Sequence, residues 1–312
     1  MKIHYNGRVR DIKYSNFHIH LTGSIPFDDI RSIADTIRYD IRQYEPLENY
    51  LNFNSPNIWA AAKEITSTQD GLLYSIESII YQQKKQNVAY IELTINPYGM
   101  VRRGLEPRII SDTVNEAYTY ASKIGVQFRV KYGINRKDPI PTIDIVKKVY
   151  DSTLDKIRVG IDLNGDEHKY PTHEFVGPFL DLKKDKVPTI IHAGEFIDQV
   201  KSLEDALRAE PYRLAHAIAS VNQSDLLDHI VSNNIAVEVA PTSNNIRRTS
   251  YNAEINPLII MHNKGASLLV GTDDQTFFGN DIAKEYQRLK TMGMDDSSIA
   301  KIQEQSIVHQ YI

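Results

Sequence analysis

The 312-residue chain contains no cysteine and a single tryptophan, and its 36 lysines and arginines are outnumbered by 40 acidic residues. Without cysteine, the chain forms no disulfide and offers no thiolate to a metal ion. Any zinc must be held by histidine, aspartate or glutamate, a ligand set typical of catalytic rather than structural sites. The formal net charge of −4 argues against a nucleic-acid or membrane-surface binder, because both need a basic excess.

Long apolar runs are also absent from the sequence. No stretch is long enough to span a bilayer, and the first residues, MKIHYNGRVRDIKY, lack the apolar core of a signal peptide. We therefore expect no membrane partner and a cytoplasmic location. The sequence carries no signal of an oligomeric state.

Segments in which apolar and polar residues alternate recur along the chain, with helix-like segments between them. The clearest is VAYIELTINP at residues 88–97, whose alternation is typical of a strand. The other expected strands are FHIH, VQFRVKYGINR, IRVGIDLNGDE, VPTIIHAGE, RLAHAIAS, NIAVEVAPTSN and ASLLVGTDD. The helix-like segments cover residues 30–37, 71–86, 109–124, 141–154, 175–186, 202–209, 224–232, 256–263 and the region from 281 onward.

Eight strands that alternate with helices predict a parallel sheet. In one chain of this length they predict an α/β fold, a single (β/α)8 TIM barrel, with additional helices after the first strand and at the C-terminus. Residues 1–312 would then form one domain. Active sites of such barrels lie at the carboxyl ends of the strands.

Two histidines, His18 and His20, end the first expected strand, just before a Gly-Ser turn. Side chains alternate in a strand, so both histidines point the same way. Neutral imidazole is a common zinc ligand. A bare His-x-His is more often a structural pair, so the evidence for a site lies further along the chain.

More polar residues follow other expected strands. His192 ends an apolar strand and Glu195 lies three residues on, His216 ends the next strand, and Asp273 and Asp274 follow the last. Each alone has an ordinary explanation, such as a core histidine, a helix N-cap or a solvated glutamate. Together they predict one site, because the strand ends of a barrel converge.

Three histidines and one aspartate would hold a zinc ion with room for a water molecule. Zinc lowers the pKa of such a water toward neutrality. A further histidine can orient or deprotonate that water, and a glutamate set back from the metal can protonate the substrate. This arrangement suits the addition of water to a polarised C=N or C=O bond.

The segment FHIHLTGSIP resembles the His-x-His-Leu-x-Gly-Ser signature of the adenosine deaminase family, within the amidohydrolase superfamily. The resemblance continues through GIDLNGDE, IIHAGE, LAH, APTSN and GTDD, in the family's order and approximate spacing. It implies a zinc-dependent hydrolase that deaminates an adenine-type purine nucleoside, adenosine or deoxyadenosine, with one Zn²⁺ per chain and a small-molecule purine as its partner.

The resemblance also implies the residues that bind the metal and transfer protons. Those that would bind zinc are His18, His20, His192 and Asp273. Glu195 would protonate the ring nitrogen N1. His216 would act on the zinc-bound water as a base or an electrostatic partner.

On the substrate side, the resemblance implies that Asp274 orients the water and meets the N7 side of the ring. The backbone N–H of Gly165 would reach N3, and a glycine fits there because a close approach of backbone to a flat ring tolerates no side chain. Thr22 would lie near the ribose 5′ end.

Three positions depart from the family's pattern. Thr22 stands where adenosine deaminases usually carry an aspartate and adenine deaminases a glutamate. The family's Glu-x-Arg appears as Glu92-Leu93-Thr94, so an interior arginine is missing, and a cysteine is replaced by Ala240.

The neutral Thr22 removes a negative charge that would repel a phosphate. The alternative substrate is therefore a 5′-substituted adenine nucleoside or an adenine nucleotide, with Arg247 or Arg248 as candidate phosphate partners, although a solvated pair is the simpler reading of these arginines.

Two further alternatives keep the barrel but change its role. One is another amidohydrolase reaction, which Glu195 argues against because a proton donor for a ring nitrogen suits deamination. The other is a catalytically silent binding relative, although every expected ligand is present. The metal could be iron or manganese instead of zinc.

We expect Trp59 to pack in the core rather than over the mouth of the site. The remaining histidines are read as surface or capping residues: His4, His168, His173, His229, His262 and His309.

Overall fold

The computed structural model describes residues 2–5, 8–11, 13–44, 56–247 and 256–310. Within these ranges, eight parallel strands form one sheet in the order β10-β9-β8-β7-β6-β5-β4-β3. They are β3 (Tyr14–His20), β4 (Val88–Ile95), β5 (Gln127–Asn135), β6 (Arg158–Asn164), β7 (Thr189–Ala193), β8 (Arg213–His216), β9 (Ala236–Val239) and β10 (Leu268–Val270).

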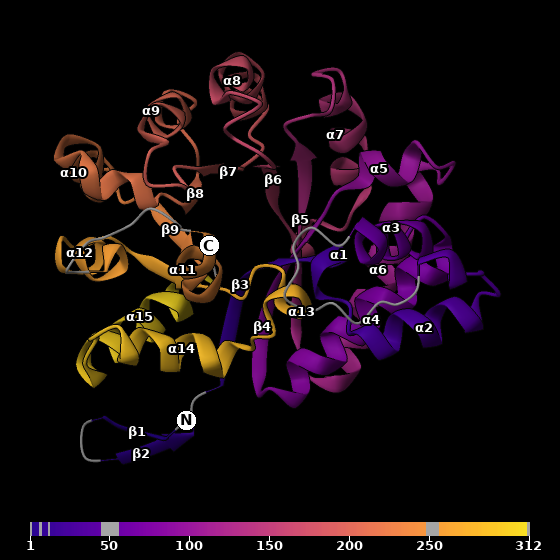
Figure 1. Ribbon diagram of the computed structural model, residues 1–312, viewed down its shortest axis with the longest axis horizontal. Coiled ribbons are helices and arrows are strands. Elements are labelled where there is room, and N and C mark those ends of the chain that lie inside the picture. The colour runs from indigo at the N-terminus through magenta and orange to yellow at the C-terminus, as the bar shows by residue number, and fades with distance from the viewer. Residues whose placement is uncertain (1, 6–7, 12, 45–55, 248–255, 311–312) are drawn as a thin grey trace.

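The first and last strands of this sheet also approach each other. The N–H groups of Thr272 and Asp273, just after β10, both donate to the carbonyl oxygen of His18 on β3, each at 2.8 Å. The sheet is thus a nearly closed barrel, seen in Figure 1 with helices around it. The predicted (β/α)8 fold is confirmed.

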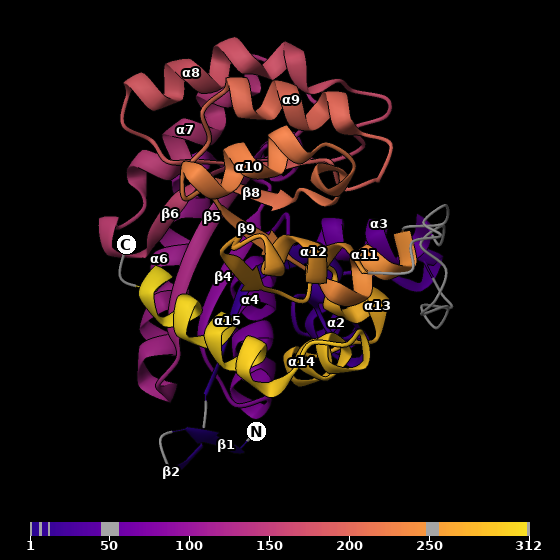
Figure 2. The same cartoon turned by 90° about the vertical axis from the view of Figure 1, so that its left-hand side faces the viewer.

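Helices connect the strands and cover the outside of the barrel (Figures 1 and 2). Those that the sequence pattern predicted are α2 (Phe27–Thr36), α4 (Gln69–Lys85), α6 (Pro107–Ile124), α7 (Thr142–Ser152), α8 (Val176–Lys184), α9 (Val200–Arg208), α10 (Ser224–Ser232), α12 (Pro257–Asn263), α14 (Ile282–Thr291) and α15 (Asp296–His309). The others are α1 (Leu21–Ser24), α3 (Pro56–Ile65), α5 (Pro97–Val101), α11 (Pro241–Arg247) and α13 (Gln275–Phe278), with 3-10 turns η1 (Arg42–Tyr44), η2 (Asp155–Ile157), η3 (Thr172–Phe175) and η4 (Ile218–Asn222).

Helix α6 shows why these segments fold locally as they do. It begins with a proline at its first position and ends before Gly125, whose φ of 73° is the left-handed conformation typical of a helix C-cap. Ile110, Val114, Ala117 and Ala121 recur every three or four residues and are fully buried. Burial of a large apolar side chain such as Ile110 contributes about 1.5–3 kcal/mol, so this stripe holds the helix against the barrel.

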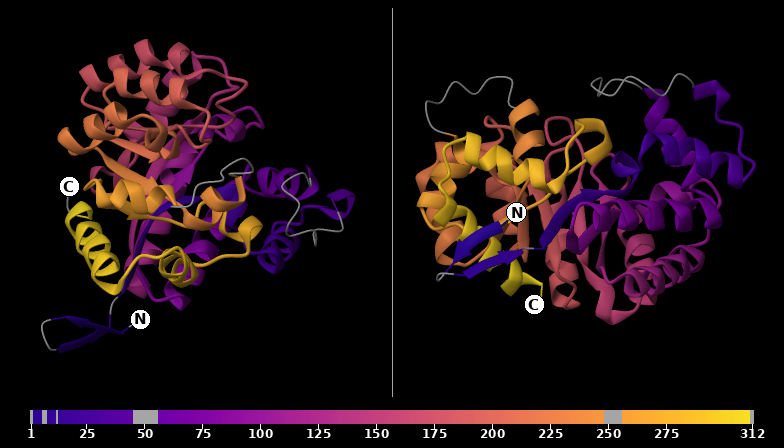
Figure 3. Two further views of the ribbon diagram at one scale, coloured as in Figure 1. Left: turned by 60° about the vertical axis from the view of Figure 1, so that its left-hand side comes forward. Right: turned by 90° about the horizontal axis from the view of Figure 1, so that it is seen from below.

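Two elements differ from the expectation. Strands β1 (Lys2–Tyr5) and β2 (Arg8–Asp11) pair as an antiparallel hairpin, which projects from the barrel in Figure 3. The sequence signal that was missed is the Asn-Gly pair between them, which favours a hairpin. The strand expected to run to Asn244 ends at Val239, because Pro241 starts α11 there.

Among the buried charged side chains of the barrel strands, four interact with one another: Glu92, Lys131, Arg213 and Glu238. Glu92 accepts a hydrogen bond at 2.8 Å from Arg213, whose guanidinium lies 3.5 Å from Glu238. Lys131 donates to Glu238 at 2.5 Å and to the carbonyl oxygen of Phe17 at 2.7 Å. Each carboxylate therefore has a cationic partner, supplied by β5 and β8 rather than by an arginine on β4.

Among the described residues, no helix combines the length and the apolar character needed to cross a membrane.

Candidate active site

A cavity of about 810 Å³ opens at the carboxyl ends of the barrel strands, a volume typical of small-molecule sites. Its walls include eight of the nine residues predicted for the site: His20, Thr22, Gly165, His192, Glu195, His216, Asp273 and Asp274. The ninth, His18, is fully buried beside them. The structure therefore brings together residues that lie more than 250 positions apart in the chain.

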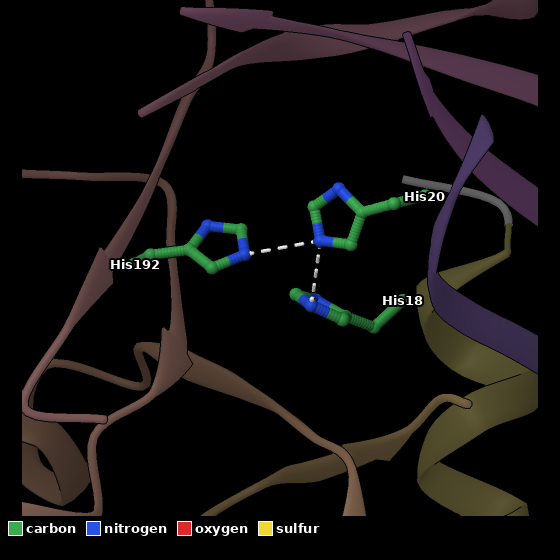
Figure 4. A group of neighbouring side chains, drawn as sticks. All are labelled: His18, His20 and His192. Atoms are coloured by element: carbon green, nitrogen blue, oxygen red, sulfur yellow. Dashed lines mark hydrogen bonds between the residues drawn. The ribbon is translucent and has the colours of Figure 1, made fainter. Parts of the chain in front are cut away.

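Three histidines meet at the floor of this cavity (Figure 4). The Nε2 atom of His20 lies 3.2 Å from Nε2 of His18 and 3.3 Å from Nε2 of His192. The carboxylate of Asp273 is 3.7 Å from Nε2 of His20. Ligand atoms of His18, His216 and Asp273 also lie within 4.8 Å of one another. The nitrogens of the three histidines thus lie close together, and the carboxylate of Asp273 lies beside them.

Buried carboxylates fix the orientation of two of these rings. The Nδ1 atom of His18 lies 2.9 Å from Glu238, and Nδ1 of His192 lies 2.9 Å from Asp162. When Nδ1–H donates to a carboxylate, the lone pair of Nε2 points the other way, into the site. Metal-binding histidines commonly show this arrangement.

The pKa values of these histidines reflect their surroundings. Burial, reinforced by the neighbouring rings of His192 and His20, holds the pKa of His18 well below its usual range. Burial likewise lowers the pKa of His20 to about 4, although Asp273 opposes this. Burial also lowers the pKa of His192, but Asp162 outweighs it and the net pKa is raised. A cation at Nε2 of His192 would compete with that proton.

His216 differs from His18 and His192 in which ring nitrogen carries the proton. Asn244 uses its Oδ1 to accept the backbone N–H of Ala240 at 3.1 Å, so its amide nitrogen faces Nδ1 of His216 at 2.9 Å. The amide is the donor in that contact, and Nδ1 of His216 is unprotonated. In the neutral ring the proton then resides on Nε2, which makes His216 a hydrogen-bond donor toward the cavity.

Two of the predicted site residues have left-handed backbone conformations. His216 has φ = 72° and Asp273 has φ = 58°. Such conformations cost non-glycine residues about 1–3 kcal/mol and persist where the surrounding structure enforces them, often at functional sites. The carboxylate of Asp273 is also held by Ser243, whose hydroxyl donates to Oδ2 at 2.6 Å.

Glu195 lies in the loop after β7, almost fully buried. Its position is set by Glu167, whose carboxylate accepts the backbone N–H groups on both sides, from Gly194 at 2.9 Å and Phe196 at 3.2 Å. Burial raises the pKa of Glu167, and the nearby charge of Glu195 raises it further. The loop is thus clamped by a second carboxyl group.

Two glycines allow close packing at the cavity, Gly165 in its wall and Gly23 behind Asp274. Gly165 has φ = 107°, which other residues rarely adopt, and a Cβ there would meet the side chain of Asn135. A Cβ on Gly23 would overlap the side chain of Asp274. Asp274 is the N-cap residue of α13 but makes no side-chain cap bond, so its carboxylate is placed against α1 and the cavity wall.

Some supporting residues were missed by sequence reasoning. Asp162, Glu238 and Asn244 contact site histidines, and the available signal was a charged or amide side chain inside or just after an apolar strand. Trp59 was expected in the core. It does stack on Phe277 at 4.2 Å, but it also lines the cavity, so that expectation was incomplete.

The structure also bears on three residues that the sequence offered as weaker candidates. His168 is an exposed residue at the cavity wall and lies 3.4 Å from Asp198. Arg248 and the side chain of Arg247 lie outside the described part of the chain.

Comparison with known proteins gives the family. The family model described as adenosine deaminase matches residues 13–312. An adenosine deaminase of Streptococcus agalactiae is 25% identical over 302 residues, covering 91% of this chain and 86% of that protein. An N6-methyl-AMP deaminase of Danio rerio is 23% identical, covering 96% and 90%. A solved amidohydrolase from Burkholderia ambifaria with bound zinc has a TM-score of 0.83 at 19% identity, covering 96% and 86%.

The fold and the histidine cluster define a barrel hydrolase of the aminohydrolase type. The chain belongs to the adenosine deaminase family, and it is a deaminase of adenine-type substrates.

Proposed function

We propose that this protein is a zinc-dependent enzyme that hydrolyses adenosine or deoxyadenosine to inosine or deoxyinosine and ammonia. The observation that carries the proposal is the convergence of three histidine Nε2 atoms, a carboxylate and a buried glutamic acid in one cavity. The similarity to adenosine deaminases supports the substrate class.

The donor set fits one zinc ion. His18, His20, His192 and Asp273 would hold it, because three imidazoles and a carboxylate leave a position open, as catalytic zinc sites require. The Nδ1 contacts of His18 and His192 with buried carboxylates supply the outer support that such ligands need. When bound there, zinc would make hydroxide available from water near neutral pH.

The chain's own residues would then carry out the proton transfers and hold the base. Glu195 donates a proton to N1 while the oxygen of water adds to C6, and the proton that this water loses restores the acid. The remaining proton of the added hydroxyl then passes to N6, the C6–N6 bond breaks, and ammonia leaves as the oxygen becomes the C6 carbonyl. His216 directs its Nε2–H at the attacking oxygen, which favours the electrostatic role over that of a base. Asp274 orients the same oxygen and meets the N7 side, and the N–H of Gly165 faces N3.

The test is to add adenosine or deoxyadenosine to the metal-loaded protein and follow the loss of adenine ultraviolet absorbance. Glu195→Gln keeps the shape of the side chain but removes the acid. Turnover should fall at least about a hundredfold, the typical contribution of general acid catalysis, while the metal content stays unchanged. A nearly wild-type rate in this variant would show that another residue is the general acid.

A second candidate function differs only in the substrate. Thr22 lines the cavity without adding a negative charge near the expected 5′ end, and the Danio rerio relative is an N6-methyl-AMP deaminase. These observations favour an adenine nucleotide or another 5′-substituted adenine nucleoside.

A further inference from the structure

Basic side chains line part of the cavity. They are Lys63, Arg102, Arg103, Lys137 and Lys169, which we call the basic wall. Lys63 belongs to α3, and the other four follow β4, β5 and β6, which are neighbours in the sheet. The chain as a whole has more acidic than basic residues, so the basic wall does not follow from average composition.

Acidic side chains line other parts of the cavity, and Asp138 and Asp166, which follow β5 and β6, lie near the cations themselves. Glu195 follows β7, and Asp273 and Asp274 follow β10. The histidine cluster lies at the strand ends, whereas the cations lie on α3 and in the segments that follow β4, β5 and β6. A substrate with its reacting ring at the histidines would therefore extend its other end toward the basic wall.

Three cations of the basic wall form no close ion pair in the described part of the chain, although the charge of Asp138 lies near all three. Arg103 pairs with Glu64 at 2.9 Å and Lys169 with Asp166 at 3.1 Å. Among residues 2–5, 8–11, 13–44, 56–247 and 256–310, no carboxylate lies within 4.0 Å of Lys63, Arg102 or Lys137.

Lys63 shows the effect of this crowding most clearly. Its Nζ atom lies over the ring of Trp59, 5.7 Å from the centroid. Burial lowers the pKa of Lys63, and the positive charges of Lys137 and Arg103 lower it further, while Asp138 opposes them. An anion placed among these cations would relieve their mutual repulsion and form charge-assisted hydrogen bonds.

We propose that the basic wall binds an anionic group on the ribose 5′ position, so that the preferred substrate is adenosine with a 5′-phosphate or 5′-carboxylate. This inference rests on the proposed function, which places the adenine ring at the histidines. A cavity of about 810 Å³ has room for more than a nucleoside. Thr22 leaves the path to the basic wall free of the carboxylate that its family position usually carries.

The first experiment compares kcat/KM of the full-length, metal-loaded protein for four compounds. They are adenosine, the neutral 5′-methylthioadenosine, AMP, and adenosine with a 5′-carboxylate. We expect the better of the two anionic compounds to exceed both neutral ones at least about tenfold, as one charge-assisted contact would give, and the advantage to shrink as salt rises. Which anion is used better separates phosphate from carboxylate. A neutral compound used as well as both anions would overturn the inference.

The second experiment removes the cations one at a time. Lys63→Met, Arg102→Met and Lys137→Met should each lower the ratio of kcat/KM for AMP over adenosine by about three- to tenfold, within the range of a partly exposed charge pair. Thr22→Asp should lower the same ratio. The control is Lys148→Met, which removes an exposed lysine of α7 away from the cavity and should leave both substrates unaffected. Ratios in the three variants that match the control would refute the role of the basic wall.

These outcomes separate this inference from the proposed function. If adenosine is deaminated but no 5′-anion is favoured, only the present inference is wrong. If no adenine compound is deaminated, the proposed function is wrong. Calorimetric titration with AMP then still shows whether the basic wall binds a 5′-phosphate. In that case, AMP binding that weakens at least threefold in Lys63→Met and Lys137→Met supports the basic wall, and equal binding contradicts it.

Discussion

The chemical role of each histidine at the cavity depends on which ring nitrogen it directs inward and whether that nitrogen carries a proton. Nδ1 of His18 faces Glu238 and Nδ1 of His192 faces Asp162, so both Nε2 atoms are directed inward. Nδ1 of His216 instead accepts from the amide of Asn244, which leaves that ring a donor. Chemically identical residues thus receive different roles from their hydrogen-bond partners.

The first prediction concerns the metal. His192→Ala should abolish both tight metal binding and activity, because it removes one of three converging nitrogens. Asp162→Asn keeps all ligands but weakens the support of His192, and should reduce metal affinity about 10- to 100-fold. Elemental analysis and competition with a chelator measure both effects.

Asp181→Asn, which changes an exposed carboxylate on α8, is the matched control. Retention of about one metal ion per chain in His192→Ala would contradict the proposed ligand set.

At the scale of elements, a buried carboxyl group joins the helices that follow the last strands. Glu285 of α14 accepts the backbone N–H of Thr242 in α11 at 2.8 Å and the amide of Asn280 at 2.6 Å. Helix α11 also carries Ser243 and Asn244, which hold Asp273 and His216. The packing of α14 against α11 therefore helps to position the residues of α11 that contact the site.

The second prediction concerns the pH dependence of stability. Burial raises the pKa of Glu285 to about 7, against the opposing hydrogen bonds from Thr242 and Asn280. Between its unfolded pKa of about 4.5 and a pH of about 7, the folded state binds a proton that the unfolded state lacks. The contribution of Glu285 to the free energy of unfolding is thus favourable below this window and falls as the pH rises through it.

Glu285→Gln should remove this fall, so the free energy of unfolding should decline less between pH 5 and pH 8 than in the wild type. Urea denaturation at several pH values measures it. Glu304→Gln, which removes an exposed carboxylate of α15, is the control for the loss of one charge. Parallel pH profiles of wild type and Glu285→Gln would show that Glu285 does not cause the decline in the free energy of unfolding.

For the whole molecule, the closed sheet brings charged residues from four strands into one interior layer. Arg213 of β8 lies between Glu92 of β4 and Glu238 of β9, and its guanidinium also sits 5.5 Å from the ring centroid of Phe17 on β3. Lys131 of β5 is the second cation. Glu238 in turn contacts His18, so the layer connects barrel stability with the floor of the cavity.

The third prediction is that Arg213→Met destabilises the fold by about 3–5 kcal/mol, because it leaves the buried Glu92 with only Lys131, at 4.0 Å, as a cationic neighbour. Arg108→Met, which breaks an exposed pair with Asp112, should cost less than about 1 kcal/mol. Urea denaturation of both variants gives the comparison.

The double variant Glu92→Gln/Arg213→Met should recover part of the loss, because the charge of Glu92 is removed as well. A loss below about 1 kcal/mol in Arg213→Met would show that the interior layer tolerates a carboxylate that has lost its closest cation.

The order of the eight barrel strands and of the main helices between them could be predicted from the sequence, and so could the residues that meet at the cavity. Periodicity sufficed for this, because each strand and helix carries its own alternation or apolar stripe, as in residues 88–97 and α6. In a closed barrel of eight parallel strands, the carboxyl ends of all strands lie at the same end, so the polar residues that follow them come close together. His18, His192 and Asp273 could thus be grouped before their distances were known.

The hydrogen-bond and ion-pair partners of those residues could not be predicted from the sequence. The pairing of Glu238 with His18, of Asn244 with His216 and of Arg213 with Glu92 spans 28 to 220 positions, and no local pattern encodes such contacts. The basic wall is likewise spread over α3 and the segments after three strands. These arrangements arise when the sheet curves and closes, because closure sets which side chains face each other across the barrel and which loops share its rim.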